Sequence, residues 1–450
     1  MNSFLKNPVA HPNPIKFASL GAVIELNDAQ LSEIELSLSQ KDFRTYIGGF
    51  YRRQILSRLG TLQGGRVCIT EGEKNSMLAS PAYGNQNEGL EATVNVFSKN
   101  FFKRTFWGGT IGAAESYIDG EWGSDNLTDL IRIMIRNLDR FQKLEKSWAY
   151  LTNQFHFWQH RNRKNSITGS RKNIHEHYDL GNSFYSLFLD ETMSYSSGIF
   201  ELEDPNGSDR FEMVDASHRK LDAICQKLAL SESDHLLEIG TGWGGLAIHA
   251  ATHYGCKVTT CTISSEQFLM ANERVRKAGL GRRVEVLFCD YRELEGQFDK
   301  IVSVEMIEAV GHEYFDQFFA QCKKLLKPGG DLLLQAITIG EQDYDHHIRR
   351  TDFIRKYIFP GGCLPSISAL SKSVGRVTDM RMTHQRDITP HYVKTLKYWR
   401  SQFLARLEDV RNLGYSNSFI RLWNFYLCYC EAAFAERRVH CVHLVYSRPE

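Results

Sequence analysis

The sequence predicts an α/β protein with a doubly wound parallel sheet, preceded by a smaller α+β domain. From about residue 215, apolar runs of strand composition alternate with helical periodicity, which is typical of parallel strands joined by crossover helices. Residues 1–152 instead mix short strand-like runs with helical patterns and glycine-rich turns. A chain of 450 residues with 42% hydrophobic and 24% charged residues has room for both domains.

The elements of the leading domain are short. Strand-like runs occupy residues 21–26, 64–70 and 91–97, and a helical pattern covers 127–141. A linker is predicted at 153–174, because five basic residues and no acidic ones fall there between Arg161 and Lys172. We interpret it as a solvated hinge or, alternatively, as a basic strip facing an anionic surface such as phospholipid headgroups.

The elements of the larger domain, 175–450, follow in a regular order. Predicted strands cover 235–240, 256–263, 283–290, 300–306, 331–339 and 440–447, and predicted helices cover 213–229, 245–254, 264–279 and 313–326. The mostly helical and aromatic stretch at about 341–435 is expected to form a cap over the sheet.

Composition narrows the class of protein. Lys+Arg 54 against Asp+Glu 53 give a net charge of +1, so no nucleic-acid partner is expected. The start lacks a signal-peptide layout, no run of 18 apolar residues occurs, and ten scattered cysteines suggest reduced thiols. We therefore expect a cytoplasmic protein. His175 and His177 lack further ligands at suitable spacing, so no metal is expected.

A glycine loop follows the first strand of the larger domain. Gly240, Gly242 and Gly244 stand between a strand and a helix, where glycine permits a tight turn and a close approach of the backbone to a ligand. With Gly245 the loop also matches G-x-G-x-x-G, so a dinucleotide must be considered.

The surrounding residues favour S-adenosylmethionine over NAD. Glu238 can hold an ammonium group, which the methionine part of that donor carries and NAD lacks. The second strand ends without the acid that a nicotinamide site needs. The neutral side chains of Thr262, Ser264 and Gln267 are expected at the ribose. Asp290 is expected to bond the adenine amino group, with Tyr291 beside it.

Several motifs resemble the cyclopropane-fatty-acid synthase family, which includes mycolic-acid and other fatty-acid methyltransferases. They lie, in the family's order, at 177–197, 236–251, 260–267, 290–294, 302–311 and 357–366. The resemblance implies a Rossmann-like methyltransferase domain. It also implies transfer of the sulfonium methyl to a cis double bond of a phospholipid acyl chain, with bound bicarbonate as the base. A homodimer, associated peripherally with the inner face of the membrane, is implied as well.

The resemblance also assigns site residues. Glu308 would anchor bicarbonate, with help from the Tyr392 hydroxyl and the Ile337 backbone, while Tyr195 and Ser196 would lie against the donor. Two positions depart from the family, because its usual cysteine is Ser197 here and its histidine is Gln335. Both keep hydrogen-bonding capacity, but glutamine cannot titrate. For the neighbouring Glu305 we expect a helix-start or structural role.

Three alternatives stay open at this point. After methyl transfer, the cation can close a cyclopropane ring, which we favour, or undergo a hydride shift that leads to a methylene- or methyl-branched chain. An NAD-linked oxidoreductase is a remote alternative. A non-enzymatic lipid-binding protein is the third, although the intact glycine loop, Glu308 and Tyr392 argue against it.

Overall fold

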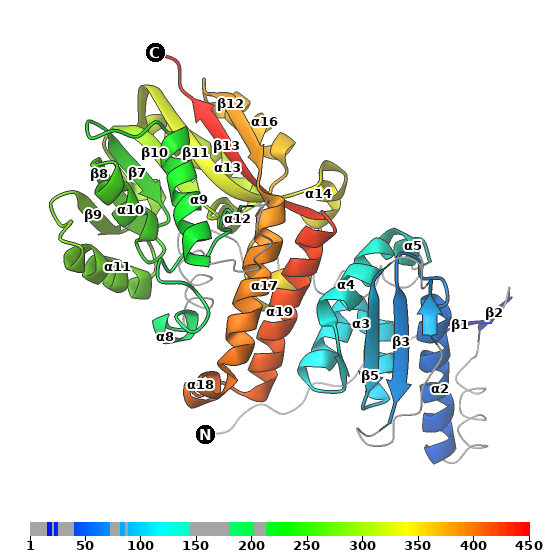
Figure 1. Cartoon of the computed structure of the whole chain (residues 1–450). Coiled ribbons are helices and arrows are strands. Elements are labelled where there is room, and N and C mark those ends of the chain that lie inside the picture. Colours follow the sequence, from blue (N-terminus) through cyan, green and yellow to red (C-terminus); the bar gives the residue numbers. More distant parts are fainter. Residues whose placement is uncertain are drawn as a thin grey trace, which may run out of the picture.

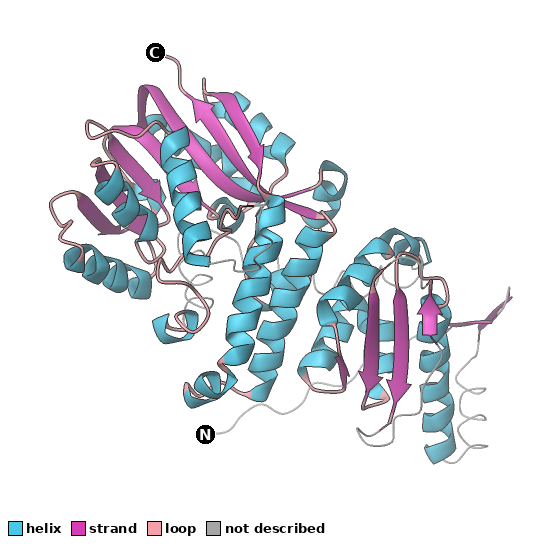
Figure 2. Ribbon diagram, viewed as in Figure 1, coloured by secondary structure: helices cyan, strands magenta, loops and turns pink. Residues whose placement is uncertain are grey.

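The computed structural model describes residues 16–19, 22–25, 40–72, 82–85, 89–144, 180–201 and 213–450. The predicted linker and the two histidines at 175 and 177 lie outside these residues. The described residues form a seven-stranded sheet, a four-stranded sheet and a two-stranded ribbon, with helices packed on the larger sheets (Figures 1 and 2).

The seven-stranded sheet has the order β12-β13-β11-β10-β7-β8-β9. Its strands are β7 (His235–Ile239), β8 (Lys257–Thr262), β9 (Val284–Phe288), β10 (Phe298–Val304), β11 (Leu326–Ile339), β12 (Arg381–Asp387) and β13 (Val439–Ser447). Strands β7 to β11 are parallel to one another, and β13 pairs antiparallel with both β11 and β12. The predicted fold class, a doubly wound α/β domain, is confirmed.

Both faces of this sheet are buried, as a doubly wound fold requires. Consecutive residues of β11 belong to different cores: Leu332 and Leu334 pack with α13 (Phe315–Leu325) and α16 (Ile367–Val377), whereas Leu333 packs with α9 (Met213–Lys227) and α10 (Gly245–His253). This is why the strands read as continuous apolar runs and not as alternating ones. The other helices that follow the strands are α11 (Ser265–Lys277) and the short α12 (Ile307–Val310).

The stretch at 341–435 is mostly helical, but one strand interrupts it. Its helices are α14 (Glu341–His347), α15 (Phe353–Tyr357), α16, α17 (Thr389–Ala405), α18 (Leu407–Asn412) and α19 (Asn417–Ala435). Strand β12 was not predicted, because its sequence RMTHQRD is polar. The strand lies at the edge of the sheet, where six of its seven side chains are exposed, and needs no apolar face there.

The leading part of the chain has its own sheet, of order β4-β3-β5-β6. Its elements are α2 (Gln40–Leu59), β3 (Arg66–Glu71), β4 (Ala82–Gly84), β5 (Glu91–Val96), α3 (Asn100–Ile118), β6 (Trp122–Ser124), α4 (Leu127–Arg136) and α5 (Leu138–Leu144), after the ribbon β1 (Lys16–Ser19) and β2 (Ala22–Glu25). The helix expected at 127–141 is broken at Asn137. That side chain bonds the backbone of Gln63 and ends α4.

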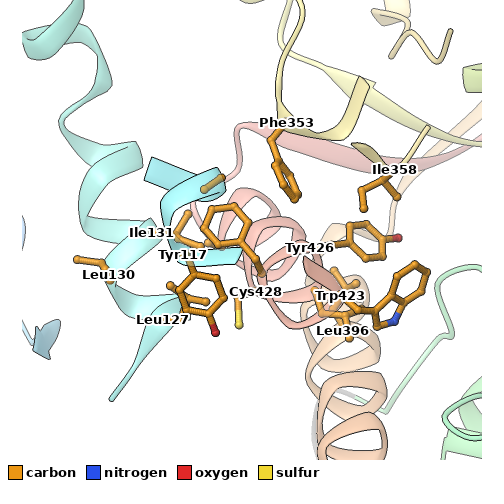
Figure 3. Close-up of a cluster of buried hydrophobic side chains, with 14 of the residues drawn as sticks. Tyr117, Leu127, Leu130, Ile131, Phe353, Ile358, Leu396, Trp423, Tyr426 and Cys428 are labelled. Atoms are coloured by element: carbon orange, nitrogen blue, oxygen red, sulfur yellow. The ribbon is translucent and has the colours of Figure 1, made fainter. Parts of the chain in front are cut away.

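The two parts are packed together along α19 (Figure 1). Figure 3 shows Tyr117, Leu127 and Ile131 of the leading part close to Phe353 and Cys428 of the larger one, in a single buried cluster. Polar contacts add to it, since the Thr128 hydroxyl donates to Glu431 at 3.2 Å and the Arg421 guanidinium lies 4.0 Å from the Tyr117 ring centre. The leading part therefore contacts the helices of the larger domain directly.

Two further properties concern the whole described structure. All ten cysteines lie in the described ranges and are free thiols. In the part of the chain that the structure describes, no helix is both long and apolar enough to cross a membrane.

Candidate active site

The predicted site residues gather at the carboxyl edge of the large sheet. Because β7 to β11 run parallel, the segments that follow β7, β8, β9 and β10 emerge at the same edge. The chain turns to one side of β7 for β8 and to the other side for β10, so β7 and β10 flank a topological switch point. Ligands of open α/β sheets bind at such a place.

The loop after β7 has a backbone that only glycine adopts without strain. Gly240, Gly242 and Gly244 have φ values of 101°, 52° and 83°. A Cβ added at Gly245 would lie 2.7 Å from the carbonyl oxygen of Thr192, so this glycine is required for packing. A Cβ at Gly242 would meet nothing within 4 Å. The loop thus leaves open space beside Gly242, at the start of α10.

Glu238 is buried at the end of β7. Its Oε2 accepts a hydrogen bond of 2.6 Å from the hydroxyl of Thr260, its neighbour on β8. Burial raises the pKa of Glu238 to about 8, against the opposing effects of the Thr260 hydrogen bond and the Lys220 ammonium. An ammonium group of a ligand would offset this desolvation, so the open loop and the buried carboxylate together fit the amino-acid part of S-adenosylmethionine.

The residues expected at the ribose and adenine lie after β8 and β9. Ser264 caps α11, and the Thr262 hydroxyl donates to Gln267 at 2.9 Å, so these three form one local network. Asp290 is buried, and both its carboxylate oxygens bond Arg292, at 2.8 and 2.6 Å. Any adenine contact would share the Asp290 carboxylate with this arginine.

The side chains after β10 make the densest polar network of the site, and Glu305 is its centre. Glu305 Oε1 accepts from the main-chain N–H of Ser197 at 3.0 Å and from Nε2 of Gln335 at 2.7 Å. Oε2 accepts from the Tyr392 hydroxyl at 2.6 Å, and the Cys441 thiol lies 3.6 Å from Oε1. Sequence reasoning gave Glu305 only a structural role and missed this network.

A histidine stands behind Gln335. His443 pairs with Gln335 across β11 and β13, and its Nε2 lies 2.9 Å from the Gln335 Oε1. Its Nδ1 lies 2.8 Å from the Lys227 ammonium, and burial keeps the His443 pKa well below its usual value. The neutral ring therefore accepts from Lys227 and donates to Gln335, which turns the amide N–H of Gln335 toward Glu305.

Glu308 lies beside this network on α12. Its Oε1 accepts from the main-chain N–H of Ile337, while Oε2 is buried without a hydrogen-bond partner among the described residues. Burial, with a further contribution from Glu305, raises the pKa of Glu308 to about 8. The site thus holds two neighbouring carboxyl groups: Glu305, bonded by several donors, and Glu308, with one uncommitted oxygen.

Three of the residues expected to hold bicarbonate bond Glu305 in this structure. The Ser197 main-chain N–H, the Gln335 amide and the Tyr392 hydroxyl all donate to the Glu305 carboxylate, while the Ser197 hydroxyl donates to the Gly198 carbonyl oxygen at 3.0 Å. Only the Glu308–Ile337 pair stands apart from Glu305. The arrangement is an anion site that already contains an anion of the chain itself.

Tyr195 and Ser196 precede this network. The Tyr195 ring packs on Tyr185 and Trp399, and its hydroxyl lies 2.8 Å from the hydroxyl of Tyr426. Ser196 accepts from the ammonium of Lys220 at 3.0 Å.

Lys220 was also missed from the sequence, although a signal was present. It lies on the face of α9 that buries Ala216 and Ile224, where a lysine needs a polar partner. Burial lowers the Lys220 pKa, and the neighbouring Glu305, Asp190 and Glu238 oppose that shift. Among the described residues, no three His, Cys, Asp or Glu side chains are placed together to hold a metal ion.

Comparisons with known proteins identify the family to which this site belongs. Residues 165–444 match the family described as mycolic acid cyclopropane synthetase. The tuberculostearic acid methyltransferase UfaA1 of Mycobacterium tuberculosis is 40% identical over 335 residues, which are 72% of this chain and 76% of that protein. The cyclopropane-fatty-acyl-phospholipid synthase of Escherichia coli is 36% identical over 382 residues, 80% of this chain and 89% of that protein.

Solved structures agree with these relatives. The cyclopropane synthase MmaA2 of Mycobacterium tuberculosis superposes with a TM-score of 0.57 at 27% identity, over 62% of this chain and 98% of that one. The mycolic acid cyclopropane synthase CmaA1, complexed with SAH and CTAB, gives 0.57 at 28% identity over the same shares.

Proposed function

Because the chain belongs to the mycolic acid cyclopropane synthetase family of S-adenosylmethionine-dependent methyltransferases, we propose that it converts a cis double bond of a phospholipid acyl chain into a cyclopropane ring. One observation carries the phospholipid: the synthase of Escherichia coli aligns over 382 residues, well beyond the family match at 165–444. That alignment includes part of the leading domain.

The chain's own residues divide the work between donor and acceptor. S-adenosylmethionine supplies an electrophilic methyl group on a positively charged sulfur. Glu238 binds the ammonium group of the donor, and the glycine loop lets the main chain approach the donor closely. The side chains that follow β8 and β9 bind its nucleoside. The alkene is a weak nucleophile, so alignment supplies much of the rate. The carboxyl groups after β10 face the positive charge that moves onto the acyl chain.

A branched product is the second candidate, and a specific observation favours it. The relative with 40% identity is a tuberculostearic acid methyltransferase by name, and the chain covers 76% of that protein. Mass spectrometry of the fatty acids from a host expressing the chain distinguishes the products. A ring resists mild hydrogenation, whereas a methylene branch takes up two hydrogens. If every modified chain is branched, the proposed ring product is wrong, whereas the assignment as a methyltransferase stands.

Donor binding should release protons and depend on Glu238. Near pH 7 the free carboxyl is mostly neutral, since its pKa is about 8, and it becomes ionised when it pairs with the ammonium. Affinity should therefore rise as pH increases toward 8. Glu238→Gln should weaken binding by about 10- to 100-fold, the loss of one charge-assisted hydrogen bond. Titration calorimetry in buffers of different ionisation enthalpy measures both effects.

A pair of glycine variants tests the same site sterically. Gly242→Val puts a side chain into the open space of the loop at a φ of 52°, so it should abolish tight donor binding. Gly281→Val is the matched control, because a Cβ there also meets nothing within 4 Å and no positive φ is present. Equal affinity of the two variants would argue against donor binding at this loop.

Membrane association is part of the proposal, because the substrate lies in a bilayer. We expect binding to anionic vesicles that weakens as salt rises, assisted by the basic residues between Arg161 and Lys172. Each contributes about 1 kcal/mol near such a surface. Vesicle sedimentation measures it, with zwitterionic vesicles as the control. If charge reversal of that segment leaves binding intact, the segment is only a hinge.

The proposed setting is the inner face of the cytoplasmic membrane, and the proposed assembly is a homodimer. Light scattering of the purified protein tests the dimer. Bicarbonate, the base expected from the family, stays a prediction. Removing bicarbonate from the assay distinguishes it from a carboxyl group of the chain as the base.

A further inference from the structure

We propose that the Glu305 carboxylate takes the place of a bound bicarbonate and is the proton acceptor of the reaction. The inference rests on the proposed function and names a catalytic residue for it. Three groups expected to hold an exogenous anion, the Ser197 N–H, the Gln335 amide and the Tyr392 hydroxyl, donate instead to this side chain. A carboxylate has the same planar pair of oxygens that bicarbonate would present to these donors.

The bonding of Glu305 leaves it able to take a proton. Each carboxylate oxygen has two lone pairs. Oε1 uses its lone pairs for Ser197 and Gln335, whereas Oε2 accepts from one donor among the described residues, Tyr392, so one lone pair remains. Glu305 as a residue is half-buried, and its carboxyl group lies within the polar network at the sheet edge.

A second anion is disfavoured at the same place. Bicarbonate would have to displace Glu305 from its donors and then lie beside it, with Glu308 close by. Like charges in a site of low polarity repel strongly. Glu308, whose Oε2 has no described partner, adds a further carboxyl group beside Glu305.

The main chain at Glu305 has a strained conformation, which helps to fix the side chain beside its donors. Its φ is 48°, a left-handed value that few non-glycine residues adopt. The Glu305 N–H donates to the Gln335 carbonyl oxygen at 2.7 Å, so main chain and side chain both attach to the same residue of β11. Strain of this kind persists where the surrounding structure over-determines it, often at functional sites.

The proposed step balances in atoms and electrons. The alkene electron pair forms a bond to the methyl carbon while the carbon–sulfur bond breaks, and its pair stays on sulfur. A cation remains on the neighbouring chain carbon. Glu305 Oε2 then takes a proton from the new methyl group, and the freed C–H electron pair closes the ring. Glu305 is left as a carboxylic acid, which returns its proton to water after the product leaves.

The first experiment uses the full wild-type chain with S-adenosylmethionine and vesicles of unsaturated phospholipid. Buffers are stripped of carbon dioxide, and the product is counted with and without added bicarbonate. We expect rates within twofold of each other. A rate that collapses on removal of bicarbonate and recovers on its addition would overturn the proposal. Failure to modify any unsaturated phospholipid, with S-adenosylhomocysteine still bound, would overturn the proposed substrate instead.

Two variants test the residue itself. Glu305→Gln should lower turnover about 100-fold or more, the usual contribution of a general base, with unchanged binding of S-adenosylhomocysteine. Glu305→Gly relaxes the positive φ and vacates the anion's place, so bicarbonate should now raise its rate at least tenfold. Glu295→Gln, an exposed glutamate after β9, is the control. Near-normal turnover of Glu305→Gln, or no response of Glu305→Gly to bicarbonate, would contradict the assignment.

Discussion

Replacing Glu308 with glutamine is expected to lower turnover by about 10²- to 10³-fold and to leave donor binding unchanged. The side chain lies beside Glu305, and its Oε2 is buried without a described partner. Burial raises the Glu308 pKa to about 8, so a positive charge on the acyl chain favours its ionised form, which stabilises that charge at short range in a site of low polarity. Glutamine keeps the bond to the Ile337 N–H through its amide oxygen but carries no charge.

The measurement is product formation at saturating donor and lipid, beside calorimetry with S-adenosylhomocysteine. Glu285→Gln, an exposed carboxylate on β9, serves as the control and should behave like the wild type. Bicarbonate should not restore Glu308→Gln, because Glu305 still fills the anion's place. Full activity of the Glu308 variant would return this glutamate to a structural role.

Truncating Phe184 to alanine is expected to lower the free energy of unfolding by about 3 to 5 kcal/mol. Phe184, on the short helix α8 (Asn182–Tyr185), is fully buried. Its ring centre lies 4.9 Å from that of Trp423 on α19 and 5.0 Å from that of Tyr415. The variant loses the transfer free energy of a phenyl ring and leaves a cavity between segments that close-packed rings hold together.

Phe288→Ala is the matched control, since Phe288 is 56% exposed. It removes the same atoms from a position already in contact with water, so its unfolding midpoint in urea should barely move. If both variants lost a similar free energy of unfolding, the aromatic cluster around Phe184 would contribute little more to stability than the exposed ring of Phe288.

Much of the fold follows from local patterns. The continuous apolar run of 332–334 predicts a strand buried on both faces, and the structure divides Leu332, Leu333 and Leu334 between two cores. Strand β12 could not be predicted in this way, because an edge strand made of polar residues has no periodic apolar signal. The break at Asn137 was likewise missed, since it depends on a contact with Gln63 far back in the chain.

The candidate site likewise has features that local sequence predicts and features that depend on distant contacts. Glycines with positive φ stand where the loop motif placed them, because a tight strand-to-helix turn is a local property. Which of two neighbouring glutamates is bonded by which donors is not local. Glu305 finds Ser197 at a separation of 108 residues and Tyr392 at 87, and His443 orients Gln335 from a different strand.

The sequence by itself determined the doubly wound fold, the glycine loop, the family and the use of S-adenosylmethionine. These depend on periodicity, short motifs and residue type, which a linear chain displays directly. Only the tertiary structure decided that the donors of Ser197, Gln335 and Tyr392 converge on Glu305 and not on Glu308. The physical reason is that a buried carboxylate is stable only where donors converge on it, and these donors come from separate elements that meet only in the folded chain.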